Sequence, residues 1–190
     1  LEYYNGVEWT SVIVNNQDLG GGTGSNTGTG HRGLFGLGFI SPTGTNQINY
    51  VTIPTLGNAQ DFGDLTAATK NFGCTSSTTR GLFIHGADGN GPAEVNIIDF
   101  VTIASTGNAS DFGDATLARR QRSGVSNGTR GVFAGGYREP ASPYFSDTID
   151  YVTIAQTGNA VDFGNLSTGT RSPASVNSPI RGVFHLAGPS

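Results

Sequence analysis

The feature of this sequence that most constrains its fold is an internal repeat of about fifty residues. The string Arg-Gly-(Leu/Val)-Phe begins at Arg32, Arg80, Arg130 and Arg181, at intervals of 48, 50 and 51 residues. A second string, Ile-(Asn/Asp)-(Tyr/Phe)-Val-Thr-Ile, begins at positions 48, 98 and 149, and a third, Gly-Asn-Ala-x-Asp-Phe-Gly, begins at positions 57, 107 and 158. A fixed period of this kind decides the fold as a whole.

Each string is short, rich in Val, Ile, Phe, Tyr and Thr, and bounded by Gly, Asn, Asp or Ser, which predicts a β-strand. A further strand is expected before each Arg-Gly string, because Ser123–Ser126 leads through Asn127-Gly128 directly into Thr129-Arg130. Asn-Gly is a strong hairpin signal, since both positions need a positive φ. No stretch indicates a helix. Four antiparallel strands in about fifty residues, repeated, predict blades of a β-propeller, and the kelch class has this period.

The two ends of the chain predict how the propeller closes. Leu1-Glu2-Tyr3 aligns with Ile149-Asp150-Tyr151, and Glu8-Trp9 aligns with Asp162-Phe163, so the N-terminus begins at the third strand of a blade. The C-terminus stops after a second strand, at Phe184-His185-Leu186. Two strands from each end then make one composite blade, which removes the exposed sheet edges that invite aggregation.

The expected fold is therefore an all-β, four-bladed, kelch-like β-propeller, with four antiparallel strands per blade and a composite N-/C-terminal blade, in one domain over residues 1–190. The blades span approximately residues 20–65, 66–115 and 116–166, with 167–190 combined with 1–18. The alternative is a section of a larger ring or of a longer chain, which the absence of Met and the start at Leu1 leave open.

Composition excludes several classes of function. The formal net charge is −4, from 10 Lys and Arg against 14 Asp and Glu, whereas general nucleic-acid binding needs a basic surface. The sequence has no apolar run long enough for a membrane helix, so no membrane insertion is expected. Cys74 is the single cysteine, which excludes an intrachain disulfide. With 30 Gly among 190 residues, large side chains for a thick helical core are scarce.

The repeat resembles known families. The line from Arg130 through Gly135-Gly136, Asp150-Tyr151 and Phe163 resembles a kelch unit, with a basic start, a glycine pair and aromatic residues in the third and fourth strands. Trp9 stands where kelch repeats usually carry Trp. The Tyr-Val-Thr-Ile, Gly-Asn-Ala-x-Asp-Phe-Gly and Arg-Gly-Val-Phe-Ala-Gly-Gly strings resemble repeats in virion-surface and tail-fibre proteins of marine bacteriophages. That resemblance implies a structural or adhesive role.

Residues that recur once per blade are expected to hold blades together, because a catalytic site needs one constellation rather than four copies. The repeated arginines are expected to be buried and clasped in bidentate fashion by acids of the third and fourth strands, Asp99 and Asp150 among them. Aromatic residues of the fourth strand are expected to pack between adjacent blades. The structural repeat residues are Arg32, Arg80, Arg130, Arg181, Asp99, Asp150, Phe62, Phe112, Phe163 and Trp9.

Motifs that resemble catalytic signatures lack their context. Asp61-Phe62-Gly63 spells the magnesium motif of kinases, but it recurs three times without a phosphate loop or a catalytic-loop signature. Gly124–Gly128 matches the nucleophile elbow, which needs a strand, a strained turn and a helix, whereas this segment lies in a predicted hairpin. No pair of histidines has metal-ligand spacing. The sequence predicts no catalytic residue, no metal site and no cofactor.

Function is expected on the face that carries the second-to-third and fourth-to-first connections, because these segments differ between repeats. Variable loops on a constant scaffold commonly carry binding specificity, and Tyr and Arg are enriched at recognition hot spots. The alternatives are that these loops are solvated or pack against neighbouring subunits. The candidate partner-binding residues are Tyr137, Arg138, Tyr144, Phe145, Arg119, Arg120 and Arg122.

These observations predict a non-enzymatic structural or adhesive module at a phage virion surface or in a tail fibre, hence on a virion surface or extracellular. Its expected partners are other virion or fibre subunits and a glycan or protein of the host surface, and no nucleic acid. The alternatives are a secreted, lectin-like, glycan-binding propeller and, third, an enzyme with an axial site.

Overall fold

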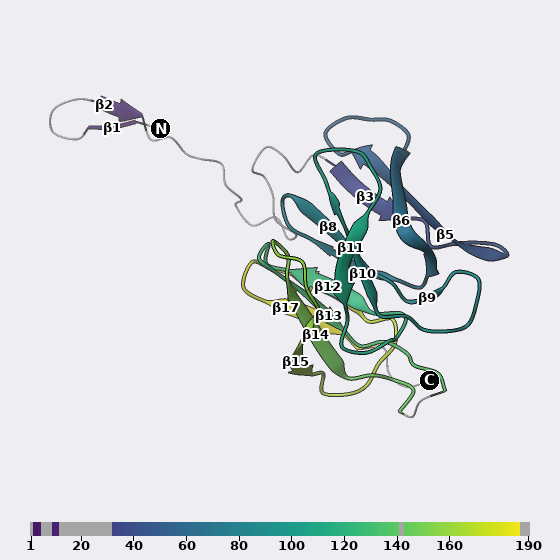
Figure 1. Ribbon diagram of the computed structural model, residues 1–190. Helices are drawn as coiled ribbons and strands as arrows, with labels where there is room; N and C mark the ends of the chain where they lie inside the picture. The colour runs from purple at the N-terminus through teal and green to yellow at the C-terminus, as the bar shows by residue number, and fades with distance from the viewer. Residues whose placement is uncertain (1, 5–8, 12–31, 141–142, 187–190) are drawn as a thin grey trace.

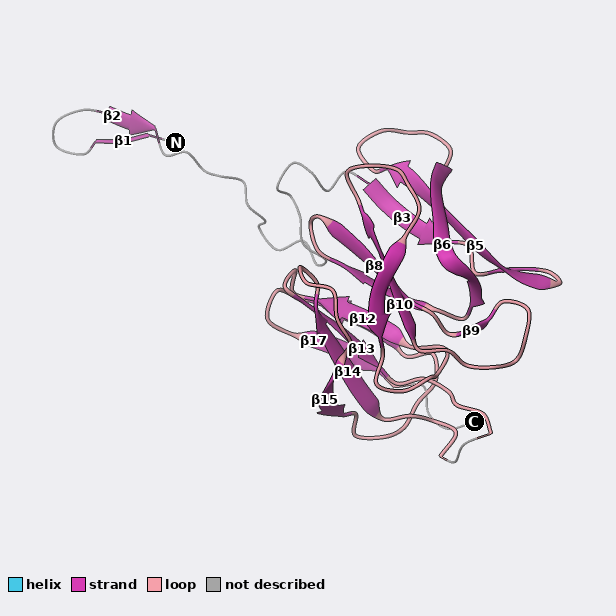
Figure 2. Cartoon of the chain, viewed as in Figure 1, coloured by secondary structure: helices cyan, strands magenta, loops and turns pink. Residues whose placement is uncertain are grey.

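The computed structural model describes residues 2–4, 9–11, 32–140 and 143–186, and every regular element among them is a β-strand (Figures 1 and 2). No helix in these ranges is long and apolar enough to cross a membrane. The strands are β1 Glu2–Tyr4, β2 Trp9–Ser11, β3 Arg32–Gly36, β4 Phe39–Ile40, β5 Thr43–Thr52, β6 Gln60–Lys70, β7 Gly73–Ser76, β8 Arg80–Ile84, β9 Ala87–Asp88, β10 Ile97–Thr102, β11 Ser110–Asp114, β12 Ser123–Ser126, β13 Arg130–Ala134, β14 Thr148–Thr153, β15 Val161–Asn165, β16 Ala174–Asn177 and β17 Gly182–His185.

Two repeats form complete four-stranded antiparallel sheets, β7-β8-β10-β11 and β12-β13-β14-β15. We call these the second and third blades. In the first blade, β3, β5 and β6 pair in the same order, and β9 from the second blade joins its outer edge. The strand content and antiparallel pairing predicted from the repeat are confirmed.

The three blades lie next to one another in chain order (Figure 1). The strands that begin successive repeats are neighbours, with β12 in contact with both β7 and β16. This approach needs glycine at position 124, because a Cβ there would overlap the carbonyl of Cys74. The hydroxyl groups of Ser123 and Ser175 lie within hydrogen-bond distance across the next junction, at 2.5 Å.

The chain ends form two separate two-stranded sheets, β1-β2 and β16-β17. No described strand pair joins them into the composite blade expected from the sequence. The alignment of Glu8-Trp9 with Asp162-Phe163 is also wrong in register, because β1 and β2 pair Glu2 with Ser11 whereas β14 and β15 pair Asp150 with Asp162. The strand bounds account for the difference, because four residues of sequence separate β1 from β2 whereas seven separate β14 from β15.

A backbone interlock at the blade junctions explains the Gly-Asn-Ala-x-Asp-Phe-Gly string. The turn of the second blade donates from Gly107 N to Phe62 O at 2.8 Å and from Ala109 N to Asp64 O at 2.7 Å. Asn108 Oδ1 accepts a bond from Asp64 N at 3.1 Å. The third blade repeats all three bonds on β11, through Gly158, Ala160 and Asn159. The second and third copies of the string therefore each bind the preceding blade.

The repeated arginines also join blades, though not as the sequence indicated. Arg32, Arg80 and Arg130 lie over the third-strand rings of their own blades, with Cζ 4.8, 4.7 and 5.0 Å from the ring centroids. Arg32 Nη1 donates to Ile103 O at 2.9 Å, and Arg80 Nη1 donates to Ile154 O at 3.0 Å. Each bond crosses to the next blade.

The expected burial of these arginines and their clasp by acids are wrong. Arg130 and Arg181 are exposed, Arg32 and Arg80 are half-buried, and none of the four has an ion pair within the described residues. The reason is that the third-strand acids Asp99 and Asp150 are buried and bind other partners, while aromatic rings and carbonyl oxygens satisfy the guanidinium groups.

The core lies between blades, as expected for the fourth-strand aromatics. Phe62 and Phe112 are each 2% exposed, and each makes an edge-on contact with the third-strand ring of its own blade at 5.9 Å. Phe163 makes the same contact with Tyr151 but is 53% exposed, because no described strand covers the outer part of the third blade. The side chain of Trp9 lies outside the described residues.

Candidate functional site

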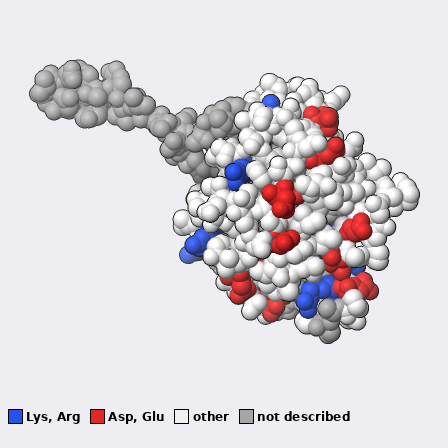
Figure 3. Space-filling view, in the orientation of Figure 1, with Lys and Arg blue, Asp and Glu red and all other residues white. Residues whose placement is uncertain are grey.

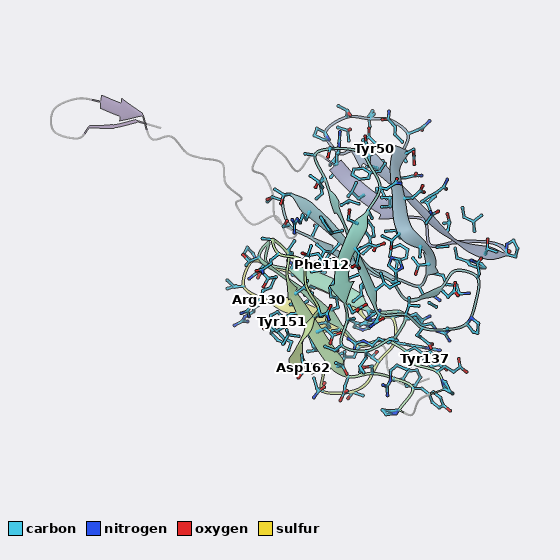
Figure 4. The ribbon with its side chains drawn as sticks, viewed as in Figure 1. Tyr50, Phe112, Arg130, Tyr137, Tyr151 and Asp162 are labelled. Atoms are coloured by element: carbon cyan, nitrogen blue, oxygen red, sulfur yellow. The ribbon has the colours of Figure 1, made fainter. Side chains whose placement is uncertain are left out.

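The second-to-third and fourth-to-first connections meet at one end of the sheets, as the strand order requires. Tyr137 of the third-blade connection pairs with Arg120 of the preceding link and with Phe145 of its own loop. In Figure 4 this end, marked by Tyr137, lies away from Tyr50 and Tyr151. The expected gathering of the variable segments on one face is confirmed.

Three rings and two guanidinium groups form what we call the aromatic patch: Arg120, Tyr137, Tyr144, Phe145 and Arg171. Tyr137 and Tyr144 stack with centroids 6.1 Å apart and planes 18° apart, and Tyr137 and Phe145 pack at 5.9 Å. Arg120 Cζ lies 4.8 Å from the centroid of Tyr137, and Arg171 Cζ lies 5.6 Å from that of Phe145. Tyr144 is 49% exposed, so a flat ring faces solvent.

Charged neighbours hold the patch in place. Arg120 lies 3.2 Å from Glu139 and 3.6 Å from the nearly buried carboxylate of Glu94. The loop backbone is fixed by a bond from Arg138 N to Tyr144 O at 2.9 Å. Figure 3 shows few charged atoms on a mostly uncharged surface, with blue and red atoms together near the end where Figure 4 labels Tyr137.

Of the seven predicted binding residues, the structure brings Tyr137, Tyr144, Phe145 and Arg120 together, with Arg138 in the same loop. Arg119 and Arg122 are different, because they are 0% and 5% exposed. The prediction that these two arginines belong to an exposed binding face is wrong. They lie beneath the patch, where the link between the second and third blades turns inward.

The buried arginines lie beside the third-strand acid of the third blade. Arg119 Nη2 donates to Asp150 Oδ2 at 2.8 Å, and the hydroxyl of Thr116 donates to the other carboxylate oxygen. Burial lowers the pKa of Arg119, and the Asp150 carboxylate opposes that shift. Arg122 donates to the carbonyls of His85, Val95 and Leu117, and burial, followed by the charge of Arg119, lowers its pKa to about 9.

The equivalent acid of the second blade, Asp99, has a different partner. Asp99 accepts bonds from Thr66 and lies 2.8 Å from His85 Nε2, with both His85 and Asp99 buried. The place of His85 is taken in the third blade by Gly135, which has no side chain, and Arg119 from the preceding link neutralises Asp150 instead. The second and third blades therefore share a buried acid at this position, where the first blade has Asn49, and the two acids have different partners.

The arrangement at Asp99 does not match a catalytic triad. Thr66 and His85 both bind the carboxylate, whereas a hydroxyl nucleophile must bind the histidine that removes its proton. Ser126 of the Gly-x-Ser-x-Gly segment accepts a bond from Gly128 N at 2.8 Å and lies in the hairpin predicted for it. Among the described residues, no three His, Cys, Asp or Glu side chains are grouped to hold a metal ion.

A groove of about 260 Å³ lies between the third blade and the β16-β17 hairpin. Its lining residues include Val132, Phe163, Ile180, Arg181 and Gly182.

Comparison of the chain with protein-family models finds no match, and comparison with curated proteins finds none either. The described residues thus combine an aromatic patch with an exposed ring, Tyr144, and two buried arginines beneath it, Arg119 and Arg122.

Proposed function

We propose that this chain is a non-enzymatic adhesive or structural module of a phage virion surface or tail fibre, and that it binds a host-surface glycan through the aromatic patch. The observation that carries the proposal is the patch itself, in which the half-buried ring of Tyr137 stacks on the exposed ring of Tyr144. The equivalent connection of the second blade, residues 86–96, has no aromatic residue. The repeated strings resemble repeats in virion-surface and tail-fibre proteins of phages, which supports a location on a virion.

The chemistry of the patch suits a sugar ring. Aromatic side chains offer a flat apolar face with little conformational entropy to lose, and Tyr hydroxyls and guanidinium groups add hydrogen-bond donors at its edge. Arg120 is already held by Tyr137 and Glu139, so ligand binding would not have to order it. The exposed face of Tyr144 is the expected stacking surface.

Binding of the labelled protein to candidate host cells and to their purified surface polysaccharides tests this function. Tyr144→Ala is expected to weaken binding by roughly tenfold, as removal of a central aromatic anchor does. The combined variant Tyr137→Ala, Arg138→Ala and Tyr144→Ala is expected to abolish it. Leu56→Ala, which truncates a fully exposed side chain outside the patch, serves as the control. Wild-type binding that survives the combined variant would contradict the assignment of the patch.

We also propose that the fold is a closed, four-bladed, kelch-like propeller in which β1 adds to the free edge of β17. Support comes from the register of the third blade, where Val132 faces Tyr151, because the same spacing would set Val183 opposite Tyr3. Val183 and Phe163 are 57% and 53% exposed, and closure would cover both. Closure would also pair the free edge of β17, which a propeller otherwise leaves open to other chains.

The single tryptophan of the chain provides a direct test of closure. In the closed ring Trp9 lies in the fourth strand of the composite blade and is covered by the neighbouring strands, so its fluorescence emission is expected at shorter wavelength in native protein than in urea. The shift is expected to be independent of protein concentration, because the pairing is within one chain. Emission equal to that of the unfolded chain would overturn closure, and a shift that appears only at high concentration would assign the pairing to a second copy.

A further inference from the structure

We propose that Arg119 and Arg122 bind a small monovalent inorganic anion of the chloride class, enclosed beneath the aromatic patch at the junction of the second and third blades. The site is independent of glycan binding. Its evidence is a set of buried donors without acceptors, a local excess of positive charge, and a place in the repeat where neither arginine has a counterpart.

Three donors of these two side chains are buried and lack a hydrogen-bond partner in the described structure. They are Nε and Nη1 of Arg119 and Nε of Arg122. Leaving a buried donor unpaired is costly, and the cost is greater for a charged group. An acceptor is therefore expected beside these nitrogens.

The charge balance indicates that this acceptor is an anion. Asp150 is the only carboxylate that ion-pairs with either arginine among the described residues. The remaining bonds of Arg122 go to carbonyl oxygens, which carry no formal charge. At greater range, Arg138 and Asp147 also act on Arg119 with opposite signs. Two buried guanidinium groups thus share one carboxylate, and one negative charge restores neutrality.

The repeat shows that the arginine pair is specific to this junction. Asn71, Gln121 and Ser172 occupy the same place in successive links, each with a positive φ of 49–61°. Counting from them, Arg119 corresponds to Thr69 and Thr170, and Arg122 corresponds to Phe72 and Pro173. Blade packing is thus achieved elsewhere without either charge, so packing alone does not account for the pair.

Close packing limits the ligand to a small ion. Gly136 lies against the stems of both arginines, and a Cβ at that position would be 3.1 Å from Arg119 Cδ and from Arg122 Cγ. The side chain of Arg119 is fully enclosed. A sugar or a nucleotide phosphate could not reach these nitrogens while the blades stay packed. A halide carries the required charge in the smallest volume.

Bromide is the direct probe, because it replaces chloride and scatters anomalously. Crystals of the full chain grown without halide and soaked in sodium bromide are expected to give an anomalous peak beside Arg119 Nε or Nη1 and Arg122 Nε. In solution, replacing gluconate by chloride at constant ionic strength is expected to raise Tm by roughly 3–6 °C when chloride is tenfold above its dissociation constant.

Arg122→Met is expected to remove the dependence of Tm on chloride, since it removes the excess charge and one donor. Arg122→Phe, which copies Phe72 of the preceding link, is the second variant if the first does not fold. Arg181→Met removes the same charge from an exposed side chain and is expected to keep the dependence. Absence of a bromide peak together with equal Tm in chloride and gluconate would overturn the proposal, and water would then satisfy the donors.

Discussion

Replacing Asp150 by Asn is expected to lower the free energy of unfolding by about 3–5 kcal/mol. Asp150 is fully buried and is the only ion-pairing carboxylate beside Arg119 in the described structure. The amide keeps the shape of the side chain but leaves two buried guanidinium groups without a carboxylate. The loss is large because an unpaired buried charge costs more than the pair itself contributes.

Urea denaturation measures this effect. Asp162→Asn, which makes the same change on the exposed surface of β15, is the control and is expected to stay within about 0.5 kcal/mol of wild type. Adding Arg119→Thr, which copies Thr69 and Thr170, to Asp150→Asn is expected to recover part of the lost stability. Equal stability of Asp150→Asn and Asp162→Asn would show that the ion pair contributes nothing to the blade junction.

Replacing Gly113 by Ala is expected to cost about 3–5 kcal/mol, by combining backbone strain with disruption of an interlock between blades. Gly113 has a φ of +140°, which L residues rarely adopt. A Cβ there would lie 2.6 Å from the carbonyl of Gly158 in the third blade. The bond from Gly158 N to Phe112 O at 2.7 Å would have to lengthen. The substitution therefore separates the second and third blades.

Gly158→Ala is the matched control for strain alone. Its φ of +156° is similar, but a Cβ at that position meets no atom within 4 Å. We expect it to cost about 1–2 kcal/mol. Thermal and urea unfolding of both variants would separate the two effects, and equal losses would mean that the close approach between blades does not limit stability.

The sequence was sufficient to predict the strands, their antiparallel order and the face on which the variable loops meet. The repeat spacing and the Asn127-Gly128 turn carried that prediction, because strand and hairpin formation depend on neighbours along the chain. It was also sufficient to find the three rings of the aromatic patch, since Tyr137, Tyr144 and Phe145 lie within one connection, but it did not predict Arg171. A loop of nine residues confines such side chains to one region whatever the rest of the fold.

The partners of the repeated arginines and of the third-strand acids could not be predicted from the repeat. The recurrence of arginines and acids at fixed positions indicated an ion-pair clasp, but recurrence establishes only that two residue types share a period. Arg80 bonds to a carbonyl 74 residues away, and Asp150 pairs with Arg119 rather than with Arg130. Pairing of side chains is decided by the direction each one takes after the strands are placed, which periodicity does not encode.

The burial of Arg119 and Arg122 was equally hidden, because three arginines in four positions of a link resemble a solvated loop. The faint signal was the exchange of His85 for Gly135, which removes the base beside the third-strand acid in one blade only. Sequence alone thus determined the secondary structure and the location of the loops, both of which follow from local preferences and the repeat. The tertiary structure alone decided which charges are buried, because burial depends on the space that other blades leave at each junction.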